Sequence, residues 1–304
     1  MEPASPAADT RAAVTLDELL ELLDMTCADD PSARVSHWVG KPQEHPADRI
    51  FGGLLLAQAL VAAGRVVQAD QRVVSLQADF VGGVPTDRPL HWEVSVVSDA
   101  PSLATRRSRL LDEAGEELFG AVTRWATVRA DLPSYSAARP WPAPDPETLP
   151  DLADRFGSDE RIPPWWRLER PVHFRHAVAP PYVAAAEPGD RQTTFLRSTG
   201  PLPDDPVVQA AMVAYVTDMS VLEPSFLALG SARHVPGARI LSLTHALTFH
   251  AASDLTDWHQ FDCRVASIAH GRAHGVGDLF DAAGRHVATA SQVGLVKTPA
   301  AVRE

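Results

Sequence analysis

The feature that most constrains the fold of this 304-residue chain is an internal repeat. Three segments of the first half match three of the second, and the pairs are 73–76 with 239–243, 92–96 with 261–265 and 112–115 with 281–284. The offset is 167 residues for the first pair, which aligns Ser75 with Ser242, and 169 for the other two. An offset this steady indicates a duplicated domain.

Each repeat has the pattern of one buried helix and an antiparallel sheet. In the first half, 52–67 is apolar and alanine-rich on nearly every side, which predicts a helix buried all round. In the second half, Asp204-Asp205-Pro206 is typical of a helix start, and the helix should run towards Val221. The strands predicted from β-rich or alternating runs are 72–81, 92–96, 106–111, 118–128, 172–175, 193–197, 240–250, 261–265, 276–280 and 286–296.

The predicted boundaries follow from these elements. Residues 1–14 form a tail, 15–130 the first domain, 131–170 a proline-rich linker or insertion, and 171–298 the second domain. A capping box at Thr15–Glu18 predicts a short helix at the start of the first domain. We expect the two sheets to join edge to edge, because that pairing covers exposed strand edges.

Composition limits the partners and the compartment. The net charge of −12 argues against a general nucleic-acid binder, although a few local arginines suffice to hold a phosphate-bearing substrate. Cys27 and Cys263 lie far apart, fit a reducing compartment and form no metal-ligand pattern. No apolar run is long enough to span a bilayer, and the N-terminus lacks the pattern of a signal peptide. These observations predict a cytoplasmic protein.

Short motifs in both halves carry a family resemblance. They are Arg49–Gly53 with Gln58–Leu60, Ser102–Arg107, Arg191–Arg197 with Pro203–Asp205, Tyr215–Asp218, Ser242–His245 with Phe249–His250, and Ser291–Gly294. In order and spacing, over roughly residues 45–297, the chain resembles the type II acyl-CoA thioesterases. The resemblance implies an α+β fold, a tandem double hot-dog in which each half is a long central helix wrapped by an antiparallel sheet. It also implies hydrolysis of acyl-CoA to free fatty acid and coenzyme A, with no cofactor.

The resemblance further implies a catalytic set of an aspartate, a hydroxyl and a glutamine in the second half. Asp218, Ser242 and Gln292 stand at those positions. An aspartate can act as general base towards water, and the other two side chains can hold and orient that water. On a helical wheel Asp218 shares a face with Val207 and Ala211, so partial desolvation should raise its pKa.

The repeat offers an internal comparison. Ser75 aligns with Ser242, Thr123 with Gln292, and the stretch 51–54, which has no carboxylate, with the region of Asp218. The first half therefore lacks the base and the amide, which predicts one active site per chain.

Further substrate contacts and alternatives remain open. Arg106 and Arg272 precede corresponding strands and could meet the phosphates of coenzyme A, and Gly53 is a candidate contact at the start of the helix predicted over 52–67. We also expect a homo-oligomer, since sheets of this kind leave surfaces that natural proteins cover. The alternative functions are a non-catalytic acyl-CoA-binding protein, a hot-dog hydratase or dehydratase, and a scaffold.

Overall fold

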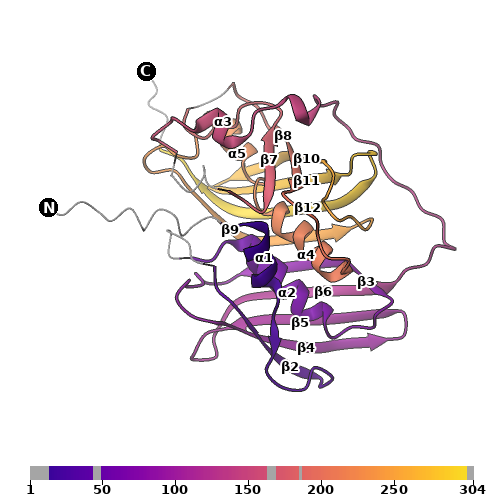
Figure 1. Cartoon of the computed structure of the whole chain (residues 1–304). Helices are drawn as coiled ribbons and strands as arrows, with labels where there is room; N and C mark the ends of the chain where they lie inside the picture. Colours follow the sequence, from indigo (N-terminus) through magenta and orange to yellow (C-terminus); the bar gives the residue numbers. More distant parts are fainter. Residues whose placement is uncertain (1–13, 44–48, 163–168, 185–186, 300–304) are drawn as a thin grey trace.

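A single twelve-stranded sheet organises the molecule. The computed structural model describes residues 14–43, 49–162, 169–184 and 187–299; residues 1–13 of the predicted tail lie outside these ranges. The sheet has the strand order β1-β2-β4-β5-β6-β3-β9-β12-β11-β10-β8-β7, and all its pairs are antiparallel. It curves around the two long helices α2 and α4 (Figure 1).

The described part of the first half contains two helices and six strands. They are α1 (Leu16–Leu23), β1 (Thr26–Cys27), β2 (Val35–Gly40), α2 (Gly52–Gly64), β3 (Gln71–Phe80), β4 (Leu90–Ala100), β5 (Leu103–Leu111) and β6 (Glu117–Thr127). The predicted capping box at the start of α1 is confirmed, since Thr15 and Glu18 exchange hydrogen bonds. The two short strands β1 and β2 are not among the predicted elements.

The second half repeats the pattern with additions. Its elements are the 3₁₀ turn η2 (Pro146–Thr148), α3 (Leu152–Phe156), β7 (Val172–His176), β8 (Arg191–Ser198), α4 (Pro206–Thr217), α5 (Pro224–Ala228), β9 (Arg239–Phe249), β10 (His259–Ala269), β11 (Arg272–Phe280) and β12 (His286–Lys297). The helix predicted to reach Val221 ends at Thr217, and a run of turns leads from Asp218 to α5.

The two half-sheets join edge to edge, as the sequence predicts, and the strands that pair are β3 and β9. These strands pair from Ser75 opposite Thr248 to Asp79 opposite Thr244. Backbone hydrogen bonds therefore fix one half against the other. The result is the tandem double hot-dog architecture expected from the sequence.

Helix α2 lies in the core between the two halves. Twelve of its thirteen residues are buried, which explains its lack of a polar face. Its one polar side chain, Gln58, donates to the carbonyl oxygens of Leu22 and Lys41 and accepts from Trp92 Nε1. A buried amide with satisfied donors and acceptor ties α2 to its surroundings at little cost.

Strand register corrects the sequence-based alignment of the two halves. In β3 the irregularity falls at Val74, and in β9 it falls at Leu243. Gln292 pairs with His245, and Thr123 pairs with Leu76 in the corresponding place. Val73 is therefore the counterpart of Ser242, at the same 169-residue offset as the other elements, and the predicted match with Ser75 is wrong by two residues.

The tight turns that mark the repeat have the same backbone form in both halves. Gly115 and Gly284 have φ of 82° and 81°, in the region that favours glycine. The side chains of Asp112 and Asp281 accept backbone N–H groups of their own turns. The shared Asp-x-x-Gly pattern thus reports a shared turn.

The segment between the halves is mostly irregular. Residues 128–145 contain no helix or strand and run along one side of the molecule (Figure 1). The predicted linker 131–170 is not irregular throughout, because η2 and α3 lie within it. Asp145 and Asp151 cap these two short elements.

Candidate active site

Three side chains named from the sequence meet in the second half. Gln292 Nε2 lies 2.7 Å from Asp218 Oδ1 and 2.6 Å from Ser242 Oγ, and it donates to both. Gln292 comes from the middle of β12, Ser242 from β9, and Asp218 from the C-terminal end of α4. Residues 74 positions apart in the chain are thus brought into one hydrogen-bonded group.

Asp218 occupies a confined place between the two long helices. It is the C-cap of α4, and its side chain is only 4% exposed. The N-terminus of α2 lies against it, and the backbone N–H of Gly53 donates to the carboxylate. A Cβ atom on Gly52 would lie 2.6 Å from Asp218 Oδ2, so only glycine permits this approach.

Burial dominates the acid–base chemistry of Asp218. It raises the pKa of this carboxyl from 3.8 to about 7, against the opposing hydrogen bonds from Gln292 and Gly53 and the charge of Arg233. The positive end of α2 also favours the ionised form. A carboxyl with a pKa near 7 is suited to accept a proton at neutral pH.

His245 is a neighbour of this group that the sequence analysis did not select. Its Nδ1 lies 3.9 Å from Asp218 Oδ1, and its Nε2 lies 3.2 Å from Thr217 Oγ1. Burial lowers the pKa of His245 to about 4, so the ring is neutral at physiological pH. Because the His245 ring is neutral, it supplies no positive charge that would stabilise the ionised carboxylate of Asp218. The contact depends on the register of β9 against β12, in which His245 lies opposite Gln292, and the sequence does not show that register.

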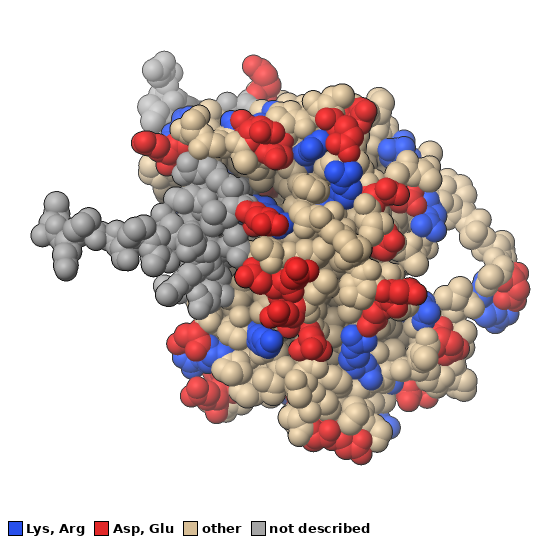
Figure 2. Space-filling model, in the orientation of Figure 1, with Lys and Arg blue, Asp and Glu red and all other residues tan. Residues whose placement is uncertain are grey.

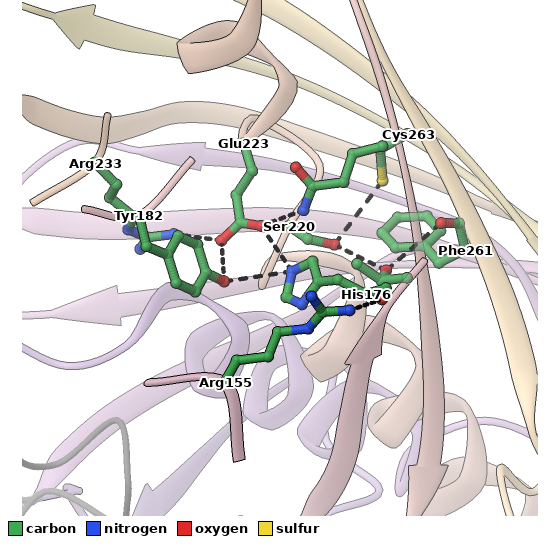
Figure 3. A network of polar contacts seen from close by, with 10 residues as sticks. Arg155, His176, Tyr182, Ser220, Glu223, Arg233, Phe261 and Cys263 are labelled. Carbon is green, nitrogen blue, oxygen red and sulfur yellow. Dashed lines mark hydrogen bonds and ion pairs between the residues drawn. The ribbon is translucent and has the colours of Figure 1, made fainter. Parts of the chain in front are cut away.

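A second buried polar network lies behind the turn that follows Asp218. Glu223 is 2% exposed, and it accepts from Tyr182, Gln192 and Arg233 at 2.8 Å each. Figure 3 shows Tyr182, Arg233 and His176 converging on this carboxylate. Burial acts to raise the pKa of Glu223, but the hydrogen bond from His176 and the charge of Arg233 outweigh it, and the pKa is lowered. The network anchors residues 218–223, and therefore the position of Asp218.

Among the residues of the first half that the structure describes, there is no equivalent catalytic group. Arg65 is the C-cap of α2, in the place that Asp218 takes on α4. Val73 and Thr123 occupy the places of Ser242 and Gln292. The stretch 51–54, which the sequence analysis aligned with Asp218, is instead the segment that packs against it. With Arg65 as the counterpart of Asp218 and Val73 as the counterpart of Ser242, the first half lacks the carboxylate and the hydroxyl as well as the amide.

The three predicted substrate contacts, Arg106, Arg272 and Gly53, lie in different environments. Arg106 is 2% exposed, and its guanidinium donates to the carbonyl oxygens of Val66 and Ser98 and pairs with Asp99. This arrangement is structural and does not suit contact with a phosphate. Arg272 is exposed at the start of β11, and Gly53 contacts Asp218.

No group of three or more metal-ligating side chains occurs among the described residues. Within the same part of the chain, no helix is long and apolar enough to cross a membrane. Figure 2 shows acidic and basic side chains interspersed over the face seen there.

Comparison with known proteins identifies the family. Residues 41–128 match a family model described as the acyl-CoA thioesterase N-terminal domain, and residues 136–296 match the acyl-CoA thioesterase C-terminal domain. The chain is 22% identical to acyl-CoA thioesterase 2 of Haemophilus influenzae, over 93% of this chain and 98% of that protein.

Solved structures agree. The tesB protein of Mycobacterium avium subsp. paratuberculosis superposes with a TM-score of 0.76 at 26% identity, covering 94% of this chain and all of that one. Acyl-CoA thioesterase II from Mycobacterium marinum superposes with a TM-score of 0.71 at 26% identity, covering 93% and 99%. The fold is thus that of the hot-dog thioesterases. The chain belongs to the acyl-CoA thioesterase family defined by these two domains.

Proposed function

We propose that this protein hydrolyses acyl-CoA thioesters with a water molecule activated by Asp218. The observation that carries the proposal is the contact of Gln292 with both Asp218 and Ser242 beside the N-terminus of α2. Membership of the acyl-CoA thioesterase family supports the substrate class.

In the proposed reaction, Asp218 removes a proton from water while the oxygen attacks the thioester carbonyl carbon. Ser242 and Gln292 hold that water, and the carbonyl oxygen becomes an oxyanion. When the oxyanion collapses, the C–S bond breaks, and the coenzyme A sulfur takes the proton from Asp218. The products are a carboxylic acid and free coenzyme A thiol, and Asp218 is ready for another turn.

The Gly52 N–H in the first turn of α2 is the proposed oxyanion donor, because the N–H groups of Gly53 and Leu54 donate to Asp218 and to the Phe51 carbonyl oxygen. Phe51 at its N-cap makes no side-chain capping bond, whereas Asp205 caps α4 by accepting from Val207 and Val208. Backbone N–H groups at a helix start stabilise developing negative charge. The side chains would then come from the second half and the oxyanion donor from the first, giving one site per chain.

The contacts to coenzyme A and the assembly are also proposals. We propose that Arg272, which is exposed, contributes to phosphate binding. We further propose that the protein acts in the cytoplasm, as a homo-oligomer and without a cofactor. Sedimentation over micromolar concentrations tests the assembly, and unchanged activity after chelation tests the absence of a metal.

Asp218→Asn tests the base. Turnover should fall about 100-fold or more, because the amide cannot accept the proton, and wild-type kcat/KM should rise with pH up to about 7. Asp79→Asn, at an exposed position on β3, is the matched control and should retain turnover. Equal turnover in both variants would remove Asp218 from the mechanism.

A single turnover in H₂¹⁸O, with enzyme in excess, separates water attack from attack by the carboxylate itself. Direct attack by water on the thioester carbonyl places the ¹⁸O label in the product acid. Label found in Asp218 after the first turnover would show a covalent intermediate instead.

A further inference from the structure

A cavity between β3 and β6 of the first half and α4 and β9 of the second occupies the place that corresponds to the candidate active site. It has a volume of about 340 Å³. Its lining includes Val73 and Trp125, which are the counterparts of Ser242 and Gly294. Phe249 lines it at the end of β9, as Phe80 lies beside Gly52 at the end of β3. The cavity is therefore the repeat of the catalytic pocket without its catalytic residues.

The side chains that replaced the catalytic set are engaged elsewhere or apolar. Arg65 Nη1 lies 2.6 Å from Asp205 Oδ2 and closes the end of α4. Thr123 Oγ1 accepts from Trp125 Nε1 at 2.8 Å. Val73 offers no polar atom. The cavity can therefore hold an apolar chain, but it lacks the side chains needed to hydrolyse a thioester.

One polar group in the cavity has no partner. Gln71 is 3% exposed and lines the cavity, and neither its Oε1 nor its Nε2 has a hydrogen-bond partner among the described residues. Leaving a buried amide without partners is costly. By register, the counterpart of Gln71 is Ile240, so this amide is not a remnant of the shared strand pattern.

Charge in the lining selects the ligand further. Arg72 lines the cavity with its guanidinium donating to the carbonyl oxygens of Ala69 and Gln71, and among the lining residues that the structure describes there is no carboxylate to repel an anion. The other lining residues are mostly alanine, valine and aromatic side chains. An apolar chain that ends in a carboxylate satisfies all three features. A volume of this size lies in the range of small-molecule sites.

We propose that this cavity is a non-catalytic binding site for a free fatty acid, with its carboxylate at Gln71 and its chain between β3, β6 and α4. The choice of a fatty acid, the acid product of hydrolysis, rests on the proposed function, whereas the cavity and the unpartnered amide do not. The site gives the first half a binding role in place of a catalytic one.

Titration calorimetry with decanoate tests the site. Gln71→Leu should weaken binding about tenfold or more, because it removes a hydrogen bond to a charged group. Val74→Trp should abolish binding by filling the cavity from the strand irregularity. Val97→Trp, at an exposed valine where β4 is irregular, is the matched control and should bind as the wild type does.

Asp218→Asn separates this site from the catalytic pocket. It should keep the decanoate binding that depends on Gln71. Wild-type affinity in both Gln71→Leu and Val74→Trp, or loss of the Gln71-dependent binding in Asp218→Asn, would overturn the proposal. Binding is read by heat and hydrolysis by coenzyme A release, so failure of the proposed function would show separately, as full turnover in Asp218→Asn.

Discussion

The buried carboxyl of Asp218 should destabilise the folded protein at neutral and alkaline pH, and Asp218→Asn should relieve this. The folded-state pKa, about 7, is raised above the unfolded value of 3.8. Between these values the folded state binds more protons than the unfolded state, so wild-type stability should fall as pH rises from about 4 to about 7. The raised pKa thus contributes stability at low pH that is lost as the carboxyl ionises.

The size of the effect follows from the shift. About three pKa units at about 1.4 kcal/mol each give about 4 kcal/mol above pH 7, as an upper bound. For a chain of this length, that corresponds to a difference in melting temperature of several degrees. The side chain is 4% exposed, so solvent screening reduces the figure little.

Thermal melting of the wild type and Asp218→Asn at pH 4 and pH 8 is the assay. The variant should gain several degrees relative to the wild type on going from pH 4 to pH 8, whatever its offset at pH 4. Asp79→Asn should show no such gain, because its side chain is exposed. A difference between wild type and Asp218→Asn that does not change with pH would show that Asp218 is not a buried carboxyl of raised pKa.

Three further predictions concern named side chains. Ser242→Ala and Gln292→Ala should each lower kcat, and the double variant should lose less than the product of the two losses, because both groups hold one water; fully multiplicative losses in steady-state assays would argue against a shared role. Arg106→Ala should lower the melting temperature markedly, since it leaves buried carbonyl oxygens unpaired. KM for acyl-CoA should not change. A raised KM with normal stability would show that Arg106 contacts the substrate. Thr123→Ala should cost about 1–3 kcal/mol of stability by removing the partner of a buried indole N–H, and kcat in the folded protein should equal that of the wild type; a large loss of kcat would place chemistry in the first half.

Sequence reasoning located most of the sheet because burial on one face imposes alternation that can be read directly. It missed β2 (Val35–Gly40), where the buried positions are Ser36, Trp38 and Gly40 and give little apolar signal. It extended the second long helix to Val221, since the turns after Asp218 are as apolar as a helix interior. Hydrophobicity alone does not separate these cases.

The candidate site could be predicted from the sequence for a different reason. The motifs around Asp218, Ser242 and Gln292 could be recognised by resemblance, and the structure brings these side chains together. Their counterparts could not be found in the same way, because the irregularity at Val74 shifts the register by an amount that the sequence does not show. The burial of Arg106 also depends on backbone carbonyls that have no sequence signature.

The contact between Asp218 and the start of α2 has a consequence for how such a protein can change. In a symmetric dimer of single domains, every substitution appears on both sides of the interface, so a helix end cannot gain a carboxylate in one place and an arginine in the other. Joining the copies in one chain removes that restriction. Asp218 against Gly53 and Arg65 against Asp205 are two opposite solutions at related positions. One copy can therefore accept mutations that would inactivate the other. The two copies can take on different functions while the shared sheet keeps their relative geometry fixed.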